Sequence, residues 1–193
     1  MTTRIRLSNG KSVTFAVGGI LGPGAVAFVE EGRGLRLLVR AEADELAQLH
    51  VTIWRDTYTG LIPQEKLDGL DPVDGAKRWR AWLTSAEAPR VVGAFDRSSG
   101  ALVGWICIGK ARDDDAPADV ELQVLNLDTA HRGTGLAHEL MTRELGDQEA
   151  YLWVVDGNER AQAFYRKHGF ELDGVGKDDT SGSYDLRMVR PRG

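Results

Sequence analysis

Hydrophobic positions in residues 35–193 recur at two spacings. Short apolar runs predict β-strands at 35–39, 91–95, 101–109, 119–127 and 151–155, and a last one alternates around 184–188. Apolar residues three and four apart predict amphipathic helices over 44–58, from 71 to about 83, over 136–145 and over 161–168. Hairpin-forming strands followed by strands joined through helices predict an α/β (α+β) fold, with a mixed, mostly antiparallel sheet between helices on both faces.

The first part of the chain follows a pattern of its own. Apolar residues alternate with polar ones from Ile5 to Val17 on either side of Asn9-Gly10, a dipeptide suited to a type I′ turn. The pattern predicts an extra N-terminal β-hairpin. We therefore expect two parts, a β-hairpin extension over 1–34 and a main domain over 35–193.

Local signals also mark the start of one helix. Asp71 is suited to cap a helix, and Pro72 fits its first turn, where a missing N–H costs nothing. The segment 60–69, between this helix and the preceding one, is expected to be a loop.

Composition narrows the class of protein. The chain has 193 residues, of which 42% are hydrophobic, enough for one ordinary globular core. The net charge of −5, without a run of Lys and Arg, argues against a nucleic-acid surface. The apolar segment 13–29 contains several glycines and a proline and is too short for a membrane span, so we expect a cytoplasmic protein without membrane contact.

Residues that often carry chemistry are mostly interpreted as structural. Cys107 stands among apolar residues and is expected in the core. The run Asp113-Asp114-Asp115 is expected in a solvated loop, because adjacent side chains rarely converge on one ion. His50 and His168 lie on apolar helix faces and show no ligand spacing, so no metal is predicted.

A glycine turn follows the strand at 119–127. There Arg132-Gly133-Thr134-Gly135-Leu136-Ala137 opens an amphipathic helix. Small residues let the backbone approach a phosphate, and a helix N-terminus favours negative charge. The turn is neither a P-loop nor a dinucleotide fingerprint. Taken alone, its glycines are explained equally well by turn geometry and by phosphate binding.

Two motifs together resemble the GNAT superfamily of N-acetyltransferases, in the bacterial small-molecule type. The order Arg132-x-x-Gly135-x-Ala137 after a strand is similar to the pyrophosphate motif of that family. Residues 158–170 look like its next element, and residues 54–63 are similar to its first helix and substrate loop. The likeness covers about 35–190. Thr129 and Asn126 depart from the usual proline and tyrosine.

The resemblance implies an acyltransferase that moves an acetyl group from acetyl-CoA to a primary amine of a small molecule by direct attack. It implies that main-chain groups of Leu125 and Leu127 bind the pantetheine arm, that N–H groups of 132–137 bind the pyrophosphate, and that Asn158 touches the cofactor arm. Asn158 is also suited to be a helix N-cap. A homodimer is expected because dimers are frequent in the family.

An unprotonated amine and a protonated leaving thiol require two proton transfers. The resemblance points to Glu121 as the base, with Asp119 or a water chain as alternatives and a solvated strand residue as the structural interpretation. It points to Tyr165 as the general acid; without the resemblance a core aromatic is favoured. Trp54 and Tyr58 are expected near the acceptor, as wall or core residues more than as direct ligands.

Two other functions remain open at this point. One is a catalytically silent acyl-CoA-binding sensor, and the other is an N-acetyltransferase that acts on a peptide or protein N-terminus. The predicted N-terminal hairpin also suits an interaction element that adds a strand to a partner's sheet. The identity of the acceptor amine does not follow from the sequence.

Overall fold

The computed structural model describes residues 2–6, 12–16 and 34–192. Strands β1 (Thr2–Arg6) and β2 (Ser12–Ala16) pair antiparallel, with Ile5 opposite Val13, as the alternation predicts. The predicted Asn9-Gly10 turn lies outside the described residues. The division of the chain at residue 34 stays a prediction.

Among the described residues, seven further strands form one sheet in the order β3-β4-β5-β6-β7-β9-β8. Every neighbouring pair is antiparallel except β6 and β7. The predicted mixed, mostly antiparallel sheet is therefore confirmed. The strands are β3 (Gly34–Leu37), β4 (Arg90–Phe95), β5 (Leu102–Lys110), β6 (Val120–Leu127), β7 (Ala150–Val155), β8 (Glu171–Asp178) and β9 (Tyr184–Arg190).

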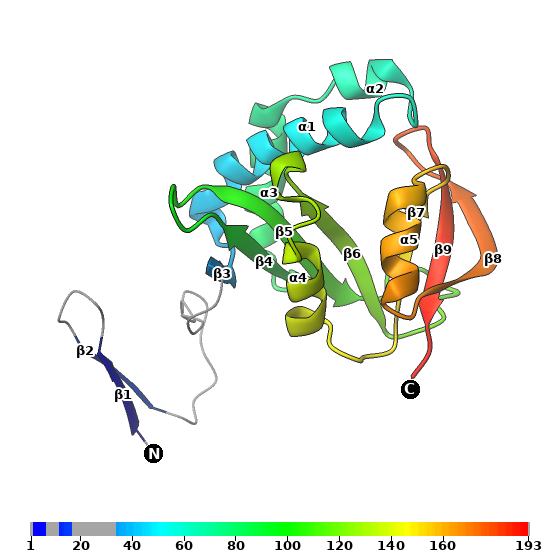
Figure 1. Cartoon of the computed structure of the whole chain (residues 1–193). Helices are drawn as coiled ribbons and strands as arrows, with labels where there is room; N and C mark the ends of the chain where they lie inside the picture. Colours follow the sequence, from blue (N-terminus) through cyan, green and yellow to red (C-terminus); the bar gives the residue numbers. More distant parts are fainter. Residues whose placement is uncertain (1, 7–11, 17–33, 193) are drawn as a thin grey trace.

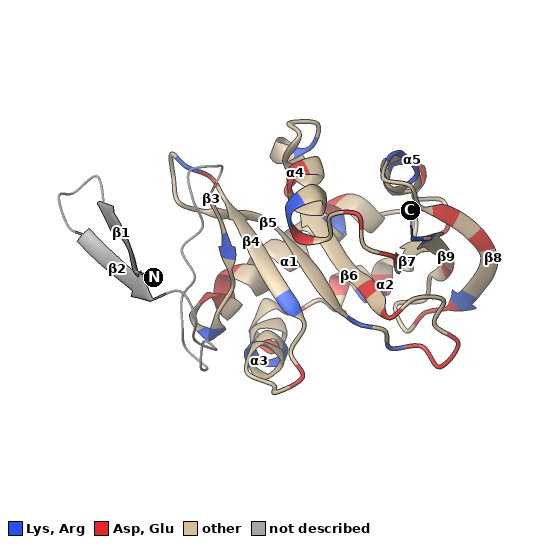
Figure 2. Ribbon diagram, turned by 90° about the horizontal axis from the view of Figure 1, so that it is seen from below, with Lys and Arg blue, Asp and Glu red and all other residues tan. Residues whose placement is uncertain are grey.

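Helices cover both faces of this sheet, as predicted (Figures 1 and 2). One face carries α4 and α5, whose apolar side chains pack with Ile106, Leu152 and Met188 in one core cluster. The other carries α1 and α3, packed around Trp105 in a second cluster. The helices are α1 (Ala43–Tyr58), α2 (Gln64–Asp68), α3 (Pro72–Leu83), α4 (Leu136–Glu144) and α5 (Glu159–Lys167), with 3-10 turns η1 (Arg40–Glu42) and η2 (Thr129–His131).

Local signals account for several boundaries. The Asp71 carboxylate accepts a hydrogen bond of 2.7 Å from the Val73 N–H, and α3 begins at Pro72, so the predicted cap is confirmed. Cys107 is fully buried, as expected of a core residue, and burial raises the pKa of its thiol to about 12. It is therefore no nucleophile at neutral pH.

Two elements were missed from the sequence. The segment 60–69 is not all loop, because it contains the short helix α2 with Leu67 buried. Strand β8 has no apolar alternation, contains Gly174 and Gly176, and its register with β9 shifts between Leu172 and Gly176. Its pairing comes from the neighbouring strand, because its own side chains bury little surface.

Candidate active site

The two parallel strands of the sheet, β6 and β7, are paired at only one position. β6 and β7 share a single register pair, Glu121 opposite Tyr151. On its other side β6 pairs antiparallel with β5, and a bulge at Gln123 interrupts the register of that pair. A bulge bends a strand and increases its twist. Among the described residues, the rest of β6 up to Leu127 therefore has no strand partner toward β7.

A cavity of about 560 Å³ lies beside this unpaired stretch of β6. Its turn end is formed by residues 125–127, 132, 133, 137 and 158, and its carboxylate end by Glu121, Asp179 and Asp185. The predicted site residues that line it are Trp54, Tyr58, Glu121, Leu125, Leu127, Arg132, Gly133, Ala137, Asn158 and Tyr165. Thr134, Gly135 and Leu136 complete the glycine turn without lining the cavity; the Leu136 side chain lies in the core.

The glycine turn has the backbone that its residues suggest. Gly133 and Gly135 have φ angles of 74° and 86°, and a Cβ on either would meet nothing within 4 Å. Gly135 is the N-cap of α4, and no side chain caps this helix. The first N–H groups of α4 therefore have no intrahelical partner. Together with the helix dipole they suit a bound phosphate.

Two guanidinium groups face the turn end of the cavity. Arg132 donates a hydrogen bond of 2.7 Å to the Thr57 hydroxyl, which ties the turn to α1. Burial lowers the pKa of Arg132, and repulsion by Arg160 lowers it further. An anion beside both groups would relieve that repulsion. Sequence reasoning missed Arg160, because it comes from α5, in the other motif.

Tyr165 lies on α5 with its ring 5.5 Å from Phe164 and 6.1 Å from Phe170. It lines the cavity, and its hydroxyl makes no hydrogen bond with a described residue. Burial raises the pKa of Tyr165, and the neighbouring Tyr58 raises it further. The phenol is therefore protonated at neutral pH and can donate into the cavity. The core interpretation and the donor interpretation are compatible here.

Asn158 has the structural role predicted for it. Its side-chain oxygen accepts a hydrogen bond of 3.2 Å from the Ala161 N–H and caps α5. The residue is 8% exposed and also lines the cavity. A contact between Asn158 and a cofactor arm stays a prediction.

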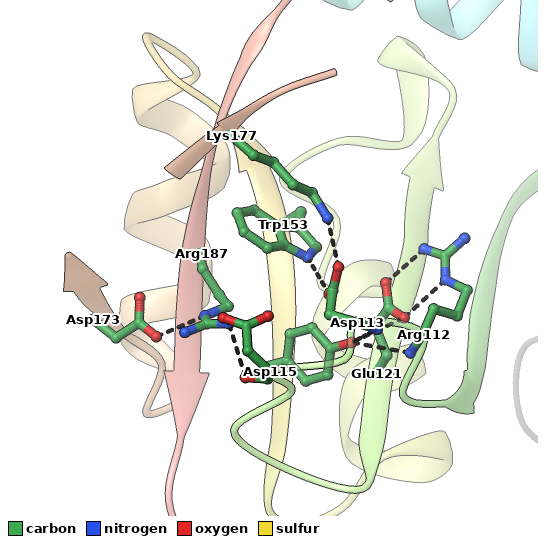
Figure 3. Close-up of polar contacts among 9 residues, drawn as sticks. Arg112, Asp113, Asp115, Glu121, Trp153, Asp173, Lys177 and Arg187 are labelled. Atoms are coloured by element: carbon green, nitrogen blue, oxygen red, sulfur yellow. Dashed lines mark hydrogen bonds and ion pairs between the residues drawn. The ribbon is translucent and has the colours of Figure 1, made fainter. Parts of the chain in front are cut away.

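Glu121 is buried and held by two neighbours (Figure 3). Arg112 makes a bidentate ion pair with it, at 2.8 Å from Nε to Oε2 and 2.5 Å from Nη2 to Oε1. The Tyr151 hydroxyl donates to Oε2 at 3.3 Å. Both carboxylate oxygens are thus engaged. The solvated-residue interpretation is wrong, since Glu121 is only 1% exposed.

The loop between β5 and β6 is tied to the far strands of the sheet (Figure 3). Asp113 accepts hydrogen bonds from Lys177 of β8 at 2.7 Å and from Trp153 of β7 at 2.8 Å. Arg187 of β9 bonds the loop residue Asp115 at 2.9 Å. The expectation of a solvated loop is wrong for Asp113, whose side chain is 18% exposed.

Sequence reasoning missed the carboxylates that the β8–β9 hairpin brings to the cavity. Asp185 of β9 is half-buried, and burial raises the pKa of its carboxyl. The Ser183 hydroxyl donates to its Oδ1 at 2.6 Å, while Oδ2 has no partner among the described residues. No motif marks Asp185, because only pairing with β7 and β8 carries it to the site.

Trp54 and Tyr58 form one aromatic edge of α1. Their ring centroids lie 5.1 Å apart in an edge-to-face arrangement. Both rings line the cavity, as expected of wall residues near an acceptor. Burial and the charge of Asp185 raise the pKa of Tyr58.

The described part of the chain has neither a metal-binding cluster nor a membrane-spanning helix. Within residues 2–6, 12–16 and 34–192, no three His, Cys, Asp or Glu side chains are grouped to hold a metal ion. None of the described helices has the length and apolarity to cross a membrane. His168, expected to be structural, packs against Phe164 at 4.5 Å between ring centroids.

Comparison with known proteins identifies the class. The model of the Acetyltransferase (GNAT) family matches residues 46–170. The Uncharacterized N-acetyltransferase Rv2669 from Mycobacterium tuberculosis is 33% identical over 141 residues, which cover 69% of this chain and 86% of that protein. The Uncharacterized N-acetyltransferase YuaI from Bacillus subtilis is 25% identical over 145 residues, which cover 68% of this chain and 80% of that protein.

Solved structures share the fold. PaiA N-acetyltransferase from Thermoplasma acidophilum, solved with coenzyme A, has a TM-score of 0.60 at 18% identity. The match covers 80% of this chain and 97% of the PaiA chain. A GCN5-related N-acetyltransferase from Rhodopseudomonas palustris has a TM-score of 0.62 at 14% identity, covering 85% and 98%. The chain thus belongs to the acetyltransferase (GNAT) family and is an acetyl-CoA-dependent acyltransferase.

Proposed function

We propose that this enzyme transfers the acetyl group of acetyl-CoA to a primary amine of a small molecule by direct attack. One observation carries the proposal: one cavity is lined by a phosphate-type turn, a protonated tyrosine and a carboxylate with one oxygen that no described residue contacts. These are the groups that amine acylation by a thioester needs, and no covalent enzyme intermediate is required.

The turn end would hold the donor. N–H groups of 132–137 and the guanidinium groups of Arg132 and Arg160 would bind the pyrophosphate. Main-chain groups of Leu125 and Leu127 would bind the pantetheine amides, because among the described residues β6 has no strand partner there on its β7 side. Asn158 would contact the arm.

In the chemical step, the amine nitrogen forms a bond to the thioester carbonyl carbon, and the carbon–sulfur bond breaks. The amine loses one proton, and the leaving thiolate gains one. Tyr165 is the proposed donor to the sulfur, because its raised pKa keeps the phenol protonated. Its hydroxyl has no competing partner among the described residues.

Two carboxylates are candidates for the base that receives the amine proton. Glu121, the candidate from the sequence, is held by a bidentate ion pair with Arg112, which proton uptake would weaken. One oxygen of Asp185 has no partner among the described residues, and burial raises the pKa of its carboxyl, which favours proton uptake. We therefore propose Asp185 beside Glu121.

Transfer is tested by measuring thiol release from acetyl-CoA with a panel of small amines and short peptides. Tyr165→Phe should lower kcat by about 100-fold, in the range of general acid catalysis, with unchanged affinity for acetyl-CoA. Tyr184→Phe is the matched control, because Tyr184 is 49% exposed and lies outside the cavity.

The same panel separates the other functions. Turnover with peptides alone would favour an N-terminal acetyltransferase. Tight acetyl-CoA binding without turnover on any acceptor would favour a sensor and contradict the proposal. A cytoplasmic location stays a prediction from the sequence, and a homodimer stays a prediction from the family.

The base is assigned by the pH profile of kcat/KM in Asp185→Asn and Glu121→Gln. The variant that removes the base should lose about 10- to 100-fold at neutral pH, and the fall in rate toward acidic pH should flatten. The other variant should keep the wild-type profile. If both variants keep that profile, a water chain is the route.

A further inference from the structure

A second cavity, of about 830 Å³, lies between α1, α3 and the turn that joins β8 to β9. Its walls are aromatic: His50 and Trp54 come from α1, and Trp79 and Trp82 from α3. Trp79 and Trp82 have ring centroids 5.0 Å apart, and His50 stacks on Trp54 at 4.9 Å. Cavities of this size with apolar walls and few polar groups are typical small-molecule sites.

The aromatic part of the wall is uncharged at neutral pH. Burial lowers the pKa of His50 to about 4, and the nearby Arg78 lowers it further, so the imidazole is neutral. Its Nδ1 is buried and has no hydrogen-bond partner among the described residues. A buried polar atom without a partner is costly.

Four charged residues line this cavity, and three of them are engaged with the protein. Lys66 donates to the Thr180 carbonyl at 3.2 Å, and Asp71 caps α3. Asp179 accepts a hydrogen bond of 2.7 Å from the Ser181 N–H. The fourth, Arg78, has no hydrogen bond or ion pair with a described residue. The cavity therefore offers indole faces, which favour stacking with another ring, beside one positive charge.

The cavity adjoins the active site. Trp54, Asp179 and Ser181 line both cavities. His50, Trp54 and Tyr58 follow one another at four-residue spacing on α1, so each step along the edge is about 6 Å. Trp54 contacts His50 on one side and Tyr58 on the other. A ligand in the second cavity thus lies about one helical turn from the wall of the catalytic cavity.

We infer that the second cavity receives the aromatic ring of the acceptor, so that the natural acceptor is a primary amine joined to a ring by a short flexible chain. The inference rests on the proposed function, because the amine must reach Tyr165. The ring stacks on the indole of Trp82, and the chain passes Trp54 to the catalytic cavity. Straight alkylamines lack the ring contact and should be poor acceptors.

The test is a series of phenylalkylamines with one to five methylene groups, each compared with an alkylamine of the same chain length. Wild type should show an optimum chain length, with a KM about 10-fold below that of the matched alkylamine, as expected for one ring contact of about 1.4 kcal/mol. Trp82→Ala should remove this advantage and leave KM for alkylamines unchanged, and Trp82→Phe should restore most of it.

Leu83→Ala is the control for mere loosening of α3, because Leu83 packs on the same core cluster without lining the cavity. It should keep the chain-length optimum. Equal KM values for ring-bearing and alkyl amines would overturn the inference and leave the proposed function intact. Acetylation of alkylamines alone, with phenylalkylamines only binding, would also overturn it. Failure of wild type to acetylate any amine would instead refute the proposed function.

Discussion

The two ends of the catalytic cavity are built in different ways. The turn end is one continuous stretch of backbone, in which Gly133 and Gly135 adopt positive φ angles and α4 begins without a side-chain cap. The carboxylate end is assembled from side chains of distant segments, such as Arg112 with Glu121 and Asp113 with Lys177. The first depends on local conformation and the second on the packing of the whole sheet.

This difference has a physical consequence. A turn made of glycines keeps its shape as long as its own backbone angles are allowed. An array of ion pairs keeps its shape only while every strand stays in register, because a one-residue slip turns side chains to the other face. Donor binding should therefore tolerate changes that disturb the carboxylate end.

The largest effect should come from breaking the turn. Gly135→Ala places a side chain at a φ of 86°, which costs about 1–2 kcal/mol or distorts the turn. Lost charge-assisted bonds to the phosphate cost about as much again. The Kd for coenzyme A should rise about 100-fold by calorimetry.

Gly174→Ala is the matched control for the turn, because Gly174 has a φ of 85° and open space around it but lies in β8, outside the cavity. It should lose similar stability and keep the wild-type Kd. An equal loss of coenzyme A affinity in both variants would show that general strain is responsible.

A smaller effect should come from the ion pairs of the strands that carry the carboxylate end. Arg187→Met removes a guanidinium that is 7% exposed and leaves Asp173 without its ion-pair partner. The free energy of unfolding should fall by about 2 kcal/mol, since a broken buried pair is costly and Asp115 is mostly exposed. KM for the acceptor should rise, while the Kd for coenzyme A stays unchanged. A parallel loss of coenzyme A binding would contradict the independence of the two ends.

The smallest effect concerns His50, in the wall of the second cavity. Its pKa is lowered from 6.5 to about 4 in the folded chain, so between these values the unfolded chain binds more protons. His50 therefore contributes full stability above pH 6.5, and this is lost as pH falls toward 4. Urea unfolding at pH 7 and pH 5 should differ by about 1–2 kcal/mol from this residue.

His50→Phe should flatten that slope, because it removes the titrating imidazole. A wild-type slope retained in His50→Phe would show that other groups carry the pH dependence.

Prediction from the sequence succeeded where one segment carries its own signal. Asp71 before Pro72 marks the start of α3, and the glycine turn marks the start of α4. Strand β8 was missed because its pairing, and not its side chains, makes it a strand. Glu121 was found, but its engagement with Arg112 was not, because the two residues meet only across the β5–β6 loop.

By itself the sequence determined the helices with apolar stripes, the strands with apolar runs, the glycine turn and, through two motifs in order, the family. Each depends on residues close in the chain, whose periodicity and backbone preferences act locally. Only the tertiary structure decided that Asp185 reaches the cavity, that Arg112 holds Glu121, and that Trp54 stands between two cavities. Those arrangements depend on strand register and helix packing, which bring together residues far apart in the chain.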